Sequence, residues 1–277
     1  QAGTEVIIKG DENTKIWFDN GAHLEAIGGG RLGLITDEDQ IKISAEGNKW
    51  DGLYFSDDSS SKSSLHSVVI SDAKTAINVE NQGITINLCD FYNNDKSILL
   101  TNASDVSILS SGFSDSNAID TPYEGGGKFE NINIADNSFS GEGTAIAISP
   151  NQRDIDKITI KNNNISDSHS LGIQVGGGGY GSHLGDIQIL NNNIRSSNGI
   201  SIGAYSWLDK KANSADLIIH ENFINSSKNA LSFGHSDYFL EGNIQISNNL
   251  FEGNSSSITY SQKTESNINN QFEISQN

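Results

Sequence analysis

Hydrophobic and polar residues alternate in short runs along most of the chain. Runs such as ITIKNNNI from Ile158, IQILNNNI from Ile187 and IQISNNLF from Ile244 place an apolar residue at alternate positions. This is the spacing of a strand that buries one face. No window shows the three- and four-residue apolar spacing of an amphipathic helix. The pattern therefore predicts an ordered, all-β chain with very little helix.

The runs belong to one repeated unit. Each copy reads Ile-x-Ile-x-x-Asn-x-Ile/Phe, passes through a few polar residues, and ends with a small residue before Ile-x-Ile/Val. Looser copies begin at Ile84, Val106, Ile132 and Leu217. The Asn position recurs every 21 to 30 residues, which indicates insertions confined to one loop. This ladder position holds, in order, Val68, Cys89, Ser111, Asn137, Asn163, Asn192, Asn222 and Asn249.

A unit of this length cannot bury its apolar face alone, so neighbouring units must stack. Parallel stacking at about 4.8 Å would join the apolar residues into one column. A repeated Asn could then hydrogen-bond to the Asn of the next unit. The pattern predicts a single-stranded right-handed parallel β-helix with an internal Asn ladder. A propeller blade needs roughly 40 residues, and a leucine-rich repeat needs Leu at fixed positions, so both fit less well.

The domain organisation follows from the repeat. Residues 1–277 are expected to form a single β-helix domain, because no linker separates two compositions. Residues 1–60 lack the Asn position and are predicted to form N-terminal coils and a cap, since an open end would expose unpaired strand edges. Residues 61–277 are predicted to form the regular coils.

Charge and composition restrict the partners. The net charge of −18 argues against nucleic acid and against anionic membranes. No stretch approaches 18 consecutive apolar residues, so membrane insertion is not expected. Cys89 is the single cysteine, which excludes an internal disulfide and a cysteine-based zinc site. The chain starts without Met, which either removal of a secretory signal or trimming of the chain would explain. A secreted or cell-surface protein is expected.

The repeat also resembles a known superfamily. ITIKNNNISDSHSLGIQV is similar to the generic parallel β-helix repeat, and GNKWDGLYFSDDSSSKSSLHSVVISDA looks like a coil of large bacterial surface proteins. The chain thus resembles the pectate-lyase-like right-handed parallel β-helix superfamily, which includes polysaccharide lyases, epimerases, glycoside hydrolases, tailspikes and bacterial surface proteins. The resemblance implies the fold but not one function. The catalytic motifs of polygalacturonases, mannuronan epimerases and pectate lyases do not occur, apart from a partial match at residues 234–236.

Long insertions point to a site. They follow the second strand of the later copies, so stacked coils would bring them to one edge as the wall of a groove, with a strand face as its floor. The insertions are residues 121–129, 149–155, 176–184, 203–215 and 234–242.

The insertions carry side chains suited to sugars, since aromatic rings stack on sugar rings and cations compensate uronate charge. The predicted substrate-binding residues are Tyr123, Tyr205, Trp207, His235 and Tyr238. The candidate catalytic residues are Tyr180, His183, Arg153, Lys210, Asp209 and Asp237, with Asp120, Glu124 and Asp154 as further carboxylates.

Two chemistries remain open. A uronate lyase or epimerase needs a base and a cation that stabilises the enolate, and Tyr180, His183, Arg153 and Lys210 could supply them. A hydrolase needs two carboxylates, from among Asp120, Asp154, Asp209 and Asp237. The clustered cations and tyrosines favour uronate chemistry slightly. Calcium is a candidate cofactor, although no D-x-D-x-D-G loop occurs.

The alternative to an enzyme is a non-catalytic module. In that case the chain would be a glycan-binding or structural β-helix of a bacterial surface protein or tailspike, and the aromatic insertions would hold a polysaccharide without changing it.

Overall fold

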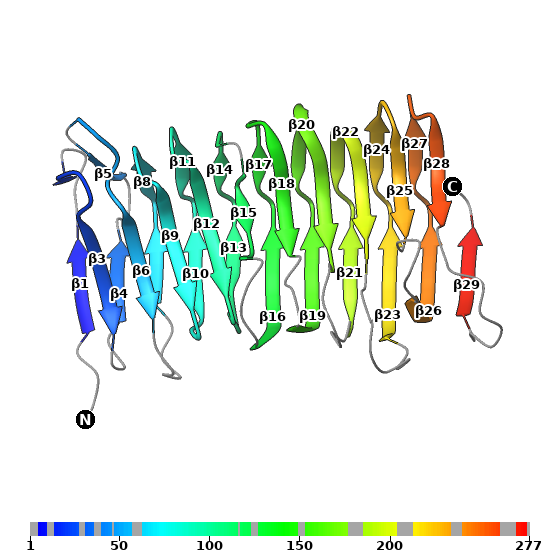
Figure 1. Cartoon of the computed structure of the whole chain (residues 1–277), viewed down its shortest axis with the longest axis horizontal. Helices are drawn as coiled ribbons and strands as arrows, with labels where there is room; N and C mark the ends of the chain where they lie inside the picture. Colours follow the sequence, from blue (N-terminus) through cyan, green and yellow to red (C-terminus); the bar gives the residue numbers. More distant parts are fainter. Residues whose placement is uncertain are drawn as a thin grey trace.

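The computed structural model consists of β-strands stacked in parallel along one long axis (Figure 1). The structure describes residues 5–9, 14–27, 31–35, 40–45, 47–56, 63–115, 117–122, 127–148, 153–176, 185–203, 213–233, 240–260 and 270–275. Within these ranges there is no helix. The prediction of an all-β parallel β-helix is therefore confirmed.

Each turn of the stack contributes strands to three faces. Face A is an 11-stranded sheet, and faces B and C are the two halves of an 18-stranded sheet that bends between them. Face A contains β1 (Glu5–Lys9), β4 (Arg31–Ile35), β7 (Ser63–His66), β10 (Ile84–Asn87), β13 (Ser107–Leu109), β16 (Gly127–Ala135), β19 (Arg153–Lys161), β21 (Ile187–Leu190), β23 (Asn213–His220), β26 (Leu240–Ser247) and β29 (Asn270–Ser275).

Face B follows face A along the chain, and face C follows face B. Face B contains β2 (Lys15–Phe18), β5 (Ile41–Ala45), β8 (Val68–Ser71), β11 (Asp90–Tyr92), β14 (Gly112–Phe113), β17 (Ser138–Phe139), the first residues of β20 (Asn164–Val175) and β22 (Asn193–Ile202), β24 (Phe223–Ser226) and β27 (Leu250–Glu252). Face C contains β3 (His23–Ile27), β6 (Gly52–Ser56), β9 (Thr75–Glu80), β12 (Lys96–Thr101), β15 (Ile119–Asp120), β18 (Gly143–Ile148), the last residues of β20 and β22, β25 (Asn229–Phe233) and β28 (Ser256–Tyr260).

Alternation along the strands builds the core. In β21, Ile187 and Ile189 are fully buried, whereas Gln188 and Leu190 are partly exposed. Because strands pair in register, Ile158, Ile187 and Leu217 follow one another in a buried column. Such columns from the three faces form one continuous cluster of aliphatic and aromatic side chains. Each such side chain contributes about 1.5–3 kcal/mol through burial, so the repeat supplies the stability that single turns lack.

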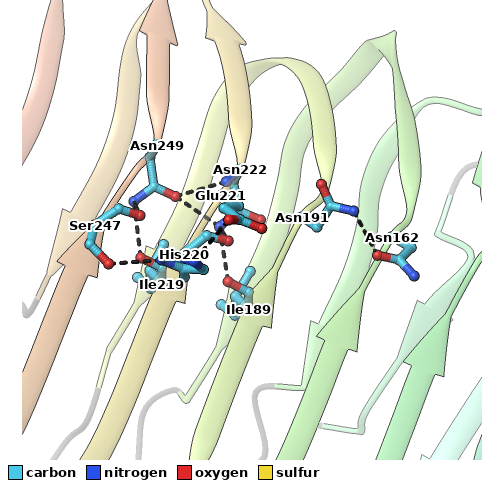
Figure 2. A network of polar contacts seen from close by, with 9 residues as sticks. All are labelled: Asn162, Ile189, Asn191, Ile219, His220, Glu221, Asn222, Ser247 and Asn249. Carbon is cyan, nitrogen blue, oxygen red and sulfur yellow. Dashed lines mark hydrogen bonds and ion pairs between the residues drawn. The ribbon is translucent and has the colours of Figure 1, made fainter. Parts of the chain in front are cut away.

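The Asn ladder is present at the corner between faces A and B (Figure 2). The Oδ1 atom of Asn222 accepts hydrogen bonds from the backbone N–H and the Nδ2 of Asn192, both at 2.9 Å. The Oδ1 of Asn249 likewise accepts hydrogen bonds from the backbone N–H and the Nδ2 of Asn222, at 3.0 and 2.9 Å. The Nδ2 of Asn222 also donates to the Ile189 carbonyl oxygen at 2.9 Å. Each buried amide thus satisfies backbone groups of neighbouring turns that the corner removes from strand pairing.

A left-handed residue precedes every ladder position and turns the chain from face A to face B. This conformation suits Asn and Asp better than other side chains, which explains the Asn-Asn pairs of the repeat. The residues and their φ angles are Ser67 (55°), Leu88 (55°), Ser110 (47°), Asp136 (60°), Asn162 (56°), Asn191 (53°), Glu221 (55°) and Asn248 (57°).

The described strands among the first 60 residues pair with the same three faces. β5 pairs with β8, and β6 pairs with β9, in parallel register. Trp50 is fully buried just before β6, where its ring stacks on Phe18 with the ring centroids 4.5 Å apart and its Nε1 donates to the Ser71 carbonyl oxygen at 2.8 Å. The division into a cap and regular coils at residue 60 stays a prediction.

Candidate functional site

The long insertions leave and rejoin the stack along one edge, the corner between faces C and A. Their preceding residues Ile148, Val175 and Ile202 are stacked in register on face C, and Phe233 follows Ile202. On the other side of the corner, Gly127 pairs with Arg153 and Asn213 pairs with Leu240 on face A. The flanks therefore lie along one edge, which we call the C–A corner. The insertions end earlier than predicted, because residues 127–129, 153–155, 213–215 and 240–242 belong to the face A strands β16, β19, β23 and β26.

Most of the predicted site residues belong to the interior of these insertions. Arg153 begins β19 at the corner, and its backbone alone is described. The remaining predicted residues, apart from the carboxylates discussed below, lie outside the described ranges: Tyr123, Glu124, Tyr180, His183, Tyr205, Trp207, Asp209, Lys210, His235, Asp237 and Tyr238. Their roles therefore stay predictions.

The outward-pointing side chains of the face C strands form a strip beside this corner. One outward row runs in register through Tyr54, Asn78, Leu99 and Asp120 in the first half of the chain. The same row continues in the second half through Ala147, Gln174, Ser201, Ser232 and Thr259. The strip offers amides, hydroxyls and one carboxylate to a ligand lying along the axis.

Asp120 is a fixed carboxylate at the edge of the strip. Its Oδ2 lies 2.7 Å from the Nζ of Lys96, and its Oδ1 accepts the backbone N–H of Thr121 at 2.9 Å. The two side chains are 24% and 38% exposed, so the pair remains accessible to a ligand. Asp154 lies across the corner on β19 and is exposed. These are the two described members of the predicted carboxylate set.

A buried histidine lies inside the stack, away from the predicted groove. His169 on β20 is 1% exposed, and among the described residues no group meets either ring nitrogen with hydrogen-bond geometry. Burial lowers its pKa below the usual value, although nearby backbone carbonyls, Gly143 first, offset part of this effect. The core therefore favours the neutral form of the ring, and this residue was not predicted from the sequence.

The sequence analysis also missed a hollow on the outer face of face B. The hollow measures about 580 Å³ and is bordered by Asp90 and Tyr92 of β11, with a floor of Gly112, Ser114 and Ser138 from the next two turns. Its visible signal in the sequence is the loss of bulky outward residues in β14 and β17 directly after the DFY segment of β11.

Among the described residues, no group of three or more His, Cys, Asp or Glu side chains is placed to hold a metal ion, and calcium stays a candidate cofactor. No helix in the described part of the chain is long and apolar enough to cross a membrane.

The stacked turns, the three faces and the Asn corner define a parallel β-helix protein. The sequence model of the family described as right-handed β-helix region matches residues 41–184, which is 144 of 277 residues. The chain therefore belongs to the right-handed β-helix family. Searches of curated proteins and of solved structures found no significant match. At the level of this family, the fold supports a carbohydrate-active or surface β-helix protein.

Proposed function

We propose that the chain is a secreted or surface-displayed carbohydrate-active protein that binds a polysaccharide along the C–A corner and processes it there. The observation that carries the proposal is the alignment of the insertion flanks on one edge, next to the polar strip of face C. A long substrate running parallel to the axis would contact several turns at once, because the insertions of the later turns leave the stack at equivalent positions.

The chemistry of the described residues is compatible with a sugar chain. Gln174, Ser201 and Ser232 provide polar groups in one row, and sugars are recognised through such hydrogen bonds. The Asp120–Lys96 pair adds a carboxylate and an ammonium group, each able to bind hydroxyls once a ligand arrives. A fixed floor of this kind would position the substrate against the insertions.

The proposed reaction is proton abstraction from a uronate, which leads to elimination or epimerisation. Tyr180 or His183 would remove the proton alpha to the carboxylate, and Arg153 or Lys210 would stabilise the resulting negative charge. In elimination, the bond between the β carbon and the glycosidic oxygen then breaks and the leaving oxygen takes up a proton; in epimerisation, a proton returns to the opposite face of the same carbon. In hydrolysis, Asp209 and Asp237 would instead act as acid and base on either side of the glycosidic bond. Both reactions use the same corner.

The test is mass spectrometry of products after incubation with a panel of uronate and neutral polysaccharides, with and without calcium. Unsaturated fragments would support the lyase, and uronates of inverted configuration, identified by NMR, would support the epimerase. Fragments carrying an added water would support the hydrolase. Tyr180→Ala and His183→Ala should abolish lyase turnover while circular dichroism shows an intact fold. Trp17→Ala, which removes an exposed aromatic of face B, is the matched control and should retain turnover.

Unchanged polymers across the panel would contradict processing. If the polymer still binds and Trp207→Ala or Tyr205→Ala removes that binding, the function is that of a glycan-binding module. If no polymer binds, the proposal of a polysaccharide site at the C–A corner is wrong.

A further inference from the structure

The hollow on face B has a rigid base. Beneath its floor, Phe91, Phe113 and Phe139 stack in the core, with ring centroids 4.9 Å apart and nearly parallel planes. The outward residues of the same strands are held in register, since Asp90 pairs with Gly112 and Gly112 with Ser138. Side chains placed on such strands keep their positions without a ligand, which lowers the cost of binding.

The walls of the hollow rise from residues of the preceding turns. Tyr92 is 47% exposed and stands next to the small side chains of the floor. The Nε2 of Gln40 donates a 2.8 Å hydrogen bond to the Oδ2 of Asp90. The other oxygen of that carboxylate, Oδ1, lies over Gly112, where an added Cβ would come within 2.5 Å of it. Asp90 is therefore oriented by Gln40 toward the floor.

These groups match the chemistry of a sugar. The ring of Tyr92 offers an apolar surface with a polar edge, on which a pyranose can stack. Asp90 can accept hydrogen bonds from hydroxyls, Lys42 can donate them, and the serine hydroxyls of the floor can do either. A volume of about 580 Å³ suits one or two sugar units, within the usual size of small-ligand sites.

The charges of the lining and of the whole chain favour a neutral sugar over an anionic one. Among the described residues, the lining holds one cation, Lys42, and one anion, Asp90, so the formal charges of these residues cancel. The chain as a whole carries a charge of −18, which disfavours an anionic glycan at a site without excess cations. A neutral glycan meets no such penalty.

We propose that this hollow is a second saccharide-binding site, which takes a neutral sugar unit between Tyr92 and Asp90. It goes beyond the function proposed above, because face B is separated from the C–A corner by faces A and C. The site would hold the protein on a neutral glycan while the C–A corner acts on a different chain or segment.

The test is isothermal titration calorimetry with neutral gluco-, galacto- and manno-oligosaccharides, and with a uronate oligosaccharide for comparison. At least one neutral oligosaccharide should bind, and Tyr92→Ala should weaken that binding by about tenfold or more. Gly112→Ala is the second variant: its methyl group displaces the Asp90 carboxylate without opposing the backbone, and it should weaken binding similarly. Trp17→Ala removes another exposed aromatic of face B, outside the hollow, and should leave binding unchanged.

The outcomes separate the two proposals. If no neutral oligosaccharide binds, or if binding is equally strong in Tyr92→Ala and Gly112→Ala, the inference is wrong. If Tyr180→Ala or His183→Ala removes the neutral-sugar binding while Tyr92→Ala keeps it, the ligand occupies the C–A corner, and the second site is excluded while the proposed function survives. Binding that depends on Tyr92 and Gly112 alone supports the second site whatever happens at the C–A corner.

Discussion

Removing one amide from the middle of the ladder should destabilise the whole stack. Asn192 is 1% exposed, and its Oδ1 accepts hydrogen bonds from the backbone N–H and the Nδ2 of Asn163, at 3.0 and 2.9 Å. In Asn192→Ala both donors lose this acceptor inside the core. A buried donor without a partner costs about 1–3 kcal/mol, so the two predict a loss of about 2–6 kcal/mol in the free energy of unfolding.

Two further variants make this prediction specific. Asn193→Ala is the same substitution one residue along, where the side chain donates a single exposed hydrogen bond to Asn164, and it should cost about 1 kcal/mol or less. Asn192→Ser should recover part of the loss, because the Oγ of Ser111 already accepts the backbone N–H of Cys89 at 3.1 Å in an equivalent position.

The assay is urea unfolding followed by circular dichroism, with the midpoints compared at a shared slope. If Asn192→Ala costs no more than Asn193→Ala, the ladder does not stabilise the corner and the reasoning fails. A change in slope rather than in midpoint would instead show that the variant has altered the cooperativity between turns.

Three other predictions follow from buried groups. Burial lowers the pKa of His169, so below about pH 6.5 the unfolded chain binds a proton that the folded chain does not. As the pH falls, the urea midpoint should therefore decrease more steeply in the wild type than in His169→Leu. An equal dependence of the midpoint on pH in the two proteins would contradict this. Burial raises the pKa of Cys89 to about 12, so a thiol reagent at about pH 8 should label the chain only after unfolding. Rapid labelling of the folded chain, measured by mass spectrometry, would refute this prediction. Gly52→Ala should lower the free energy of unfolding by more than about 3 kcal/mol, because the new Cβ would lie 1.7 Å from the Thr75 carbonyl oxygen. Gly47 has a similar φ but open space around it, so Gly47→Ala should lower the free energy of unfolding clearly less in the same urea assay.

The sequence was sufficient to predict the strands and the ladder. Ile158 and Ile187 belong to runs whose alternation survives in the structure, because only one register buries both. Asn163 and Asn192 were identifiable because a polar residue repeated between apolar strands needs a buried partner of its own kind. The left-handed conformation of the residue before each ladder position could not be predicted from the sequence, since Leu88 and Ser67 adopt it as well as Asn and Asp.

The hollow on face B could not be predicted in the same way. Tyr92 and Ser114 are 22 residues apart in the sequence, and the spacing between turns varies too much to show which outward residues adjoin. Only the register of β11 with β14 places Gly112 beside Asp90 and leaves the space over it. His169 was missed for a similar reason: β20 runs without interruption from face B to face C, and its register shifts where the histidine turns inward.

The stacking of turns also determines how the molecule would respond to tension. β1 and β29 lie at opposite ends of the stack (Figure 1), and the hydrogen bonds between strands run along the axis that joins them. A force applied at the two ends would therefore peel off terminal turns one after another instead of shearing a whole sheet. Each released turn of about 26 residues, the distance from Asn137 to Asn163, would add about 90 Å of extended chain. Attached between two surfaces, the protein would lengthen in steps and absorb strain gradually.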